Sequence, residues 1–170
     1  MSKTKYIAIC GVLTAAAIVL HIIEAMLPNP LPIPGVKLGL ANIITLWCIY
    51  QLGLKPAFTI TVLRTIVSAL LLGTFLSMNF LMSISGGIVS MLVMYLAYRL
   101  LRKASPIGIS ILGAASHNMA QLAVAALVID QIAIFYYLPI LFVAALPAGI
   151  ITGIAVKILL KRLNKQILQL

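Results

Sequence analysis

Acidic residues are almost absent from this chain, whose 170 residues include only Glu24 and Asp130. Two carboxylates cannot build the magnesium sites that phosphoryl or diphosphate chemistry requires. The sequence has no glycine-rich Walker A segment, and Asp130 falls at the outer end of a predicted helix, where no Ser–His–Asp arrangement is indicated. We therefore expect a protein that is not an enzyme and that hydrolyses no ATP of its own.

Cysteine and charge are scarce as well. Cys10 and Cys48 fall in apolar segments and neither has a second thiol nearby in the sequence, so we predict no disulfide, no metal site and no cofactor. Charged residues make up 8% of the chain, whereas soluble domains contain about a quarter. Hydrophobic residues reach 64% and the mean hydropathy is +1.21. This composition is typical of an integral membrane protein.

The basic residues, which give a net charge of +10, follow a pattern. They lie before, after and in every second connection between the apolar segments: Lys3, Lys5, Lys55, Arg99, Arg102, Lys103, Lys157, Lys161, Arg162 and Lys165. The other connections contain only Lys37, and Arg64 falls inside a segment. Basic connections stay in the cytoplasm, so both termini are predicted to be cytoplasmic. No nucleic-acid partner is expected, because these residues do not gather in one patch.

Six apolar segments predict six transmembrane helices, at about residues 5–27, 38–52, 56–73, 80–101, 107–129 and 138–163. A span needs about 20 residues, so the second and third are short and are expected to lie partly against protein. The first has the charged start of a signal peptide, but it is long enough to span and lacks a small-x-small cleavage site, so we interpret it as retained. No internal repeat is evident. The sequence predicts one all-α transmembrane domain over residues 1–170.

Charges inside a membrane are costly and are usually functional. Arg64 lies near the middle of the third segment and must face protein, water or an anion. Glu24 lies in the outer third of the first segment. An ion pair between them and a ligand contact by Arg64 are both open, and the two roles are compatible. His21, one turn before Glu24 on the same face, is either a packed histidine or part of a proton relay.

Polar side chains also interrupt the fourth and fifth segments. His117, Asn118 and Gln121 share one side of the fifth segment, and Asn79 and Ser83 open the fourth. Such groups either join helices by hydrogen bonds or recognise a ligand, and the small residues around 85–90 allow helices to approach closely. With alternating helix directions, all of these residues fall in the middle and outer half of the membrane. A shared outward-facing cavity would account for them together.

The connection after the first segment alternates proline over residues 28–35 and is expected to be stiff and extended. It is either a rigid spacer or a cover over an outward-facing pocket. Lys37 follows it, and the positive N-terminal ends of the second, fourth and sixth helices point to the same side. With Arg64 beneath, the field favours an anion such as a phosphate, diphosphate or carboxylate, although Lys37 is equally consistent with an interfacial anchor.

The inner half of the first segment carries small residues at helical spacing. Ala8, Gly11 and Ala15 give a smooth face, and Gly11 and Ala15 form a small-xxx-small pair. This face either packs within the monomer or docks a partner subunit.

Several runs together carry a family resemblance: Pro34 to Ile43 (PGVKLGLANI), Glu24, Arg64, Ser85-Gly86-Gly87 with Ser90 and Met91, Gly113 to Gln121 (GAASHNMAQ), Tyr137-Leu138-Pro139, and Gly149 to Gly153. The chain resembles the Gx transporter family, often labelled heptaprenyl diphosphate synthase component I, over nearly its whole length. That family is similar to the S components of energy-coupling factor (ECF) importers. The resemblance implies a six-helix bundle with an outer pocket capped by the first loop. It also implies docking of the first helix onto a T component with two ATPases, although Gly11 replaces an alanine of the usual docking pattern.

The resulting prediction is an S component of a bacterial plasma membrane that captures a small metabolite outside and delivers it by toppling, a motion that the resemblance implies. We expect Arg64 and Lys37 to contact an anion, and Asn42, His117, Asn118 and Gln121 to give polar recognition. Glu24 would orient Arg64 or bind a hydroxyl or amine. An isoprenoid or quinone precursor and a vitamin such as a flavin remain open as substrates. The alternatives are a non-catalytic membrane subunit of a prenyl diphosphate synthase and a proton-coupled carrier that uses His21 and Glu24.

Overall fold

The computed structural model describes residues 2–27, 39–101 and 103–163, and in these ranges every regular element is a helix. The order is α1 (Lys3–Met26), α2 (Leu40–Gln51), α3 (Leu54–Leu71), α4 (Met78–Leu100), α5 (Pro106–Ile129), the 3₁₀ helix η1 (Ile132–Tyr137) and α6 (Leu138–Leu163). The predicted all-α class is therefore confirmed for the part described. Lys37 and the proline-rich connection lie outside the described residues.

Side-chain caps explain why some helices begin earlier than predicted. The hydroxyl of Ser77 accepts a hydrogen bond from the Phe80 backbone N–H, so α4 begins at Met78 rather than at residue 80. The hydroxyl of Ser105 caps α5 in the same way through Gly108, with Pro106 at the first helical position. Serine satisfies backbone N–H groups that have no partner within a helix, and proline has no such group to satisfy.

Five of the helices are long and apolar enough to cross a membrane, and α2 is the exception. Its 12 residues extend about 18 Å at 1.5 Å per residue, which is less than the hydrocarbon thickness of about 30 Å. Large apolar side chains point outward from the bundle, including Leu127 at 81% exposed and Leu100 at 76%. An apolar surface of this kind is expected where helices face lipid, and it indicates a multi-pass membrane protein.

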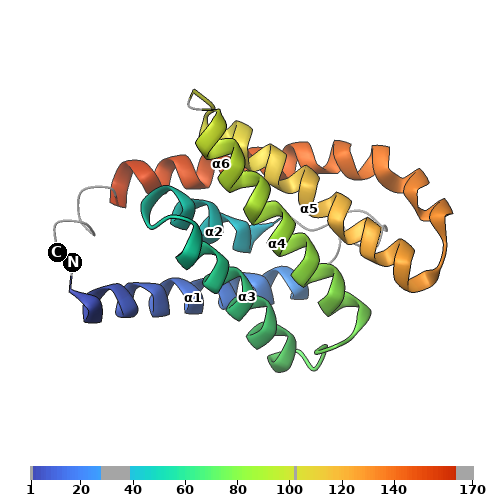
Figure 1. Ribbon diagram of the computed structural model, residues 1–170, viewed down its shortest axis with the longest axis horizontal. Coiled ribbons are helices and arrows are strands. Elements are labelled where there is room, and N and C mark those ends of the chain that lie inside the picture. The colour runs from blue at the N-terminus through green and yellow to red at the C-terminus, as the bar shows by residue number, and fades with distance from the viewer. Residues whose placement is uncertain (1, 28–38, 102, 164–170) are drawn as a thin grey trace.

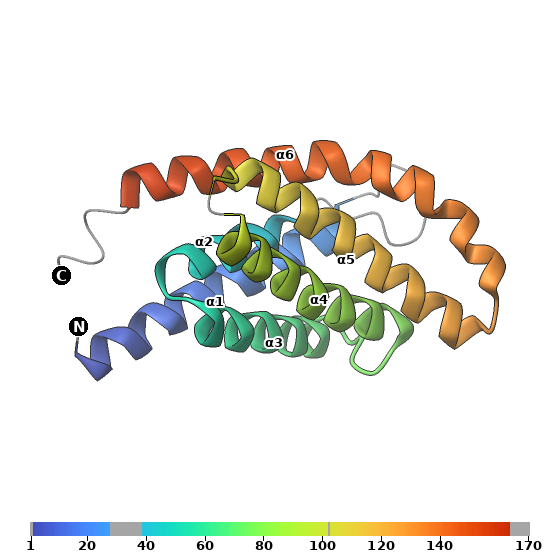
Figure 2. The same ribbon diagram turned by 45° about the horizontal axis from the view of Figure 1, so that its top comes forward.

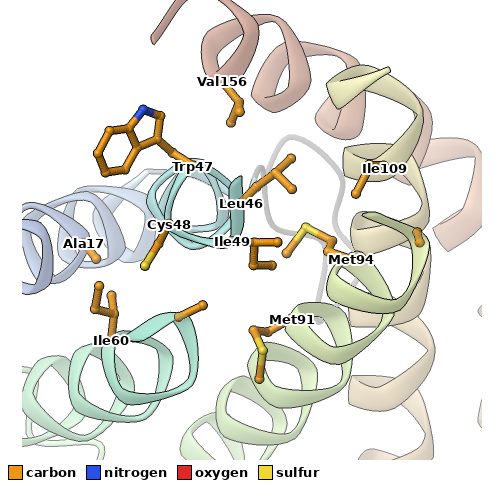
Figure 3. Close-up of a cluster of buried hydrophobic side chains, with 12 residues drawn as sticks. Ala17, Leu46, Trp47, Cys48, Ile49, Ile60, Met91, Met94, Ile109 and Val156 are labelled. Atoms are coloured by element: carbon orange, nitrogen blue, oxygen red, sulfur yellow. The ribbon is translucent and has the colours of Figure 1, made fainter. Parts of the chain in front are cut away.

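The short helix α2 lies at the centre of the bundle. Seven of its 12 residues are buried, and it packs against α1, α3, α4 and α6. Figure 3 shows the main apolar core around it, with Leu46 and Ile49 from α2 meeting Ile60, Met91 and other residues of the neighbouring helices. The prediction that this helix lies against protein is confirmed.

The remaining helices form the frame around α2. In both ribbon views the start of α1 and the end of α6 lie at the same end of the bundle (Figures 1 and 2). Helix α5 packs along α4 on one side and α6 on the other. By contrast, α1 packs chiefly on α2 and α3. Only 6% of its most apolar stretch is buried, against 39–50% for the other long helices, so α1 is the least enclosed of the long helices.

Glycines of α6 set its distance from α5. A Cβ atom on Gly153 would lie 2.5 Å from the Cα atom of Ile107, and a Cβ atom on Gly149 would lie 2.6 Å from the Cα atom of Ile111. The two helices therefore touch backbone to backbone along this seam, as small residues at a spacing of four allow in membrane bundles.

Candidate ligand-binding site

Arg64 is the central charged residue of the site. It lies in the middle of α3 and is 3% exposed, so its guanidinium is shielded from bulk water. One Nη2–H donates to the Oδ1 atom of Asn42 on α2 over 2.9 Å, whereas Nε has no hydrogen-bond partner in the described structure. A buried guanidinium with an unused N–H is costly unless something else accepts from it.

Glu24 approaches the same place from the last turn of α1. Its carboxylate accepts a hydrogen bond from the backbone N–H of Gly39, the residue that precedes α2. Gly39 has φ +74°, a left-handed conformation that favours glycine. A carboxylate at this position also complements the positive N-terminal end of α2. Glu24 therefore has a structural role in fixing the start of the central helix.

Five predicted site residues meet around one small cavity. It holds about 10 Å³, enough for about one water molecule. Its walls contain Glu24, Asn42, Arg64, Ser83 and His117, together with His21 and Gly39. These side chains come from five helices, α1 to α5, so the structure brings together five of the residues that the sequence indicates as candidates. Glu24 and Arg64, which carry opposite charges, both line this cavity.

A second cavity of about 10 Å³ lies beside the first and shares Gly39, Asn42 and His117 with it. Its other walls include Asn118 from α5 and Thr152 from α6. The hydroxyls of Ser110 and Thr152 hydrogen-bond to each other across these two helices. Ser110 and Thr152 are not among the residues predicted from the sequence, where the only signal for them is a serine and a threonine within apolar helices.

A third and larger cavity of about 280 Å³ follows, and Asn118 belongs to both it and the second. Its wall is almost entirely apolar and comes from α4, α5, η1 and α6: Met78, Met82, Leu122, Ala125, Ile129, Ile134, Tyr137 and Leu141, with Asn118 and Gln121 as the polar members. Asn118 uses its Nδ2–H to donate to the Leu141 carbonyl over 3.0 Å, which ties α5 to α6. The three cavities form a row from Arg64 to Gln121.

Two consecutive glycines of α4 make this row compact. A Cβ atom on Gly86 would lie 2.9 Å from both His117 and Gln121, and a Cβ atom on Gly87 would lie 3.6 Å from the Nη2 atom of Arg64. The absence of side chains at these positions lets α5 and α3 bring their polar groups against α4. The predicted role of these small residues, to permit close helix approach, agrees with this geometry.

Other predicted residues lie elsewhere. Asn79 is exposed in the first turn of α4 and belongs to none of these three cavity walls. Ala8, Gly11 and Ala15 are exposed on α1, and a Cβ atom on Gly11 would meet nothing within 4 Å. Within the described ranges, no group of three or more histidine, cysteine, aspartate or glutamate side chains is placed to hold a metal ion.

Comparison with known proteins gives one family and no individual relative. Neither the curated proteins nor the solved structures produced a match to the chain. The model of the family described as heptaprenyl diphosphate synthase component I matches residues 13–159, which is most of the sequence and covers all or part of every helix that contributes to the row of cavities. The chain, whose described elements are all helices and have the features of a multi-pass membrane protein, therefore belongs to the heptaprenyl diphosphate synthase component I family, a Gx transporter-like family.

Proposed function

We propose that this chain is the substrate-binding S component of an ECF importer in a bacterial plasma membrane. It captures a small anionic metabolite at the outer face, and a T component with two ATPases drives delivery. The resemblance of its motifs to the Gx transporter family, which is similar to S components, supports this role. The scarcity of acidic residues supports it too, because the chain itself lacks the carboxylates for magnesium-dependent chemistry.

The observation that carries the proposal is the row of cavities. A bundle with a purely structural role would bury apolar side chains at its centre, since a buried polar group costs free energy unless it is satisfied. Here polar groups from α1 to α6 gather along three neighbouring cavities, with Arg64 in the wall of the first and Gln121 in the wall of the third. Concave sites with a few convergent polar groups are typical of small-molecule binding.

Arg64 is the residue we assign to the anion. Its unused Nε–H supplies a donor, and the N-terminal end of α2 adds positive potential beside it. The cavity there accommodates about one water, so a carboxylate or phosphate enters only when the surrounding helices part. Helix α1 is the least enclosed of them, which makes its movement the least costly way to admit the ligand. Lys37 is proposed as a second anion contact.

The transport role predicts that uptake depends on partner subunits. Proteoliposomes containing the chain with its T component and ATPases should accumulate the metabolite only when ATP is inside with the ATPase domains. Proteoliposomes containing the chain alone should bind the metabolite and accumulate none. Mass spectrometry of small molecules retained after gentle purification identifies the metabolite for both measurements. Accumulation without any ATPase would contradict the proposal and favour the proton-coupled carrier.

The small residues of α1 are proposed to dock the T component. We expect Gly11→Leu to reduce co-purification of the T and ATPase subunits at least tenfold while leaving ligand binding by the chain unchanged. The reason is that the face is exposed and nothing within 4 Å opposes a Cβ atom there, so the added bulk disturbs a partner and not the monomer. Thr59→Leu, on an exposed part of α3, is the matched control and should co-purify normally. An equal loss of co-purifying T and ATPase subunits in both variants would count against docking at Gly11.

The family description favours one alternative, a non-catalytic membrane subunit of a prenyl diphosphate synthase. In that case the row of cavities would hold a synthase substrate or product, and the partner would be a soluble prenyltransferase. Co-purification separates the two roles. Recovery of a prenyltransferase subunit in place of the ATPases supports the synthase role and contradicts the importer.

A further inference from the structure

The large cavity at the Gln121 end of the row differs in chemistry from the charged end. Its volume is about 280 Å³, whereas a cavity of about 150 Å³ lined by apolar side chains is large enough for benzene. Among the residues that the structure describes, no lysine, arginine, aspartate or glutamate contributes to its wall. The space therefore suits an uncharged, mostly apolar group of about two fused rings.

Gln121 is the feature of this wall that points to a ligand. Its side chain is 1% exposed, and neither the Nε2 donor nor the Oε1 acceptor has a hydrogen-bond partner in the described structure. Its neighbour Asn118, by contrast, uses its amide to bond the Leu141 carbonyl. An amide buried with both ends unsatisfied loses the hydrogen bonds that it would make in water and gains none in return.

Water is a poor occupant for this large cavity. A buried water typically needs two to four polar partners, and beyond Gln121 and Asn118 the wall offers chiefly methionine, leucine, isoleucine and alanine side chains. An anion is also a poor occupant, because it satisfies the Nε2 donor but repels the Oε1 acceptor. A neutral group with an adjacent donor and acceptor satisfies both atoms at once.

We propose that this cavity binds a neutral, apolar moiety of about two fused rings that presents a lactam or carboxamide edge to Gln121. The moiety forms two hydrogen bonds, one from Nε2–H to its carbonyl oxygen and one from its own N–H to Oε1. This inference rests on the proposed function, since it names the chemistry of the part of the captured metabolite that lies away from Arg64.

Two matched probes test the assignment. 2-Quinolinone has a bicyclic body with a lactam edge, and 1-methyl-2-quinolinone has the same body and carbonyl without the N–H donor. With the full chain in lipid nanodiscs, calorimetry corrected for empty nanodiscs should show saturable binding of 2-quinolinone. It should bind about tenfold more tightly than the methylated probe, because one hydrogen bond and its paired acceptor are lost.

Variants then locate the binding. Gln121→Leu should weaken 2-quinolinone about tenfold and remove the difference between the two probes, whereas Gln51→Leu, on the last residue of α2, should change neither. Ala125→Phe should block both probes by filling the cavity. Partition into lipid without saturation overturns the proposal. An unchanged ratio between the affinities for the two probes in Gln121→Leu also overturns it. So does binding of either probe by Ala125→Phe.

Binding of these probes needs neither ATP nor a partner subunit, so it fails or succeeds independently of transport. Saturable, Gln121-dependent binding with no ATP-dependent uptake would remove the importer role and keep the cavity assignment. ATP-dependent uptake with no probe binding would keep the importer role and remove the cavity assignment.

Discussion

Replacing Gly149 and Gly153 together by alanine is expected to destabilise the bundle severely, although it adds only two methyl groups. The new Cβ atoms would lie 2.6 Å from the Cα atom of Ile111 and 2.5 Å from the Cα atom of Ile107. A side chain at such a distance could rotate away, but a backbone atom cannot, so α5 and α6 must separate. Overpacking in a protein core typically costs about 1–3 kcal/mol per site. We expect each of the two substitutions to lower the free energy of unfolding by about 3 kcal/mol.

Unfolding in mixed detergent micelles, followed by the loss of helical circular dichroism, measures this cost. Gly11→Ala is the matched control, because nothing lies within 4 Å of the added methyl group. Alanine is favoured over glycine within a helix by about 1 kcal/mol, so the control should be slightly stabilised. An unfolding midpoint of the double alanine variant equal to that of the wild type would contradict the backbone contact between α5 and α6.

This seam shows where sequence reasoning stops. The spacing of four between Gly149 and Gly153 places both on one face of a helix, and close packing against some neighbour follows from residue size. Which helix they meet depends on the whole bundle. Ile107 and Ile111 are ordinary apolar residues in the sequence, and nothing local marks them as the contact.

The polar residues of the candidate site were easier to select from the sequence. A charged or amide side chain in an apolar segment must find a partner inside the protein, so Glu24, Arg64, His117 and Asn118 could be selected from the sequence. The structure brings these four to the first two cavities. The bond between Arg64 and Asn42 could not be predicted, because it joins residues on different helices whose relative rotation is set by packing.

The large cavity was beyond prediction for a different reason. A void is what remains after all side chains are placed, and no residue pattern encodes it. One wall of this cavity is Ile134 and Tyr137 from η1, a 3₁₀ helix that lies in the predicted connection between the fifth and sixth segments. Gln121 could be selected as polar, but not as unsatisfied.

Removing the charge of Arg64 is expected to have the largest effect on function. Arg64→Met should abolish ligand retention, since it deletes the proposed anion contact and the hydrogen bond to Asn42. It should also lower the free energy of unfolding, by about 3 kcal/mol, because Glu24 then faces the shared cavity without its opposite charge. A loss of binding in this variant alone would therefore have two explanations, the loss of the anion contact and the loss of stability.

The double variant Arg64→Met with Glu24→Gln separates them. It removes both charges, so most of the lost stability should return, while the amide of the new glutamine can still accept from the Gly39 backbone N–H. If Arg64 contacts the anion, ligand retention stays abolished despite the recovered stability. Glu24→Gln alone should keep Arg64 positive and retain the ligand, unless Glu24 also contacts it.

Mass spectrometry of the small molecules that co-purify with each variant gives the functional readout, and detergent unfolding gives the stability. Arg99→Met controls for the loss of a positive charge elsewhere, since Arg99 is exposed at the end of α4 with its guanidinium 5.9 Å from the Tyr95 ring centre. That variant should retain the wild-type ligand. Ligand retention equal to wild type in the double variant would remove Arg64 from the binding site, because a folded bundle would then bind without any charge at the centre of α3.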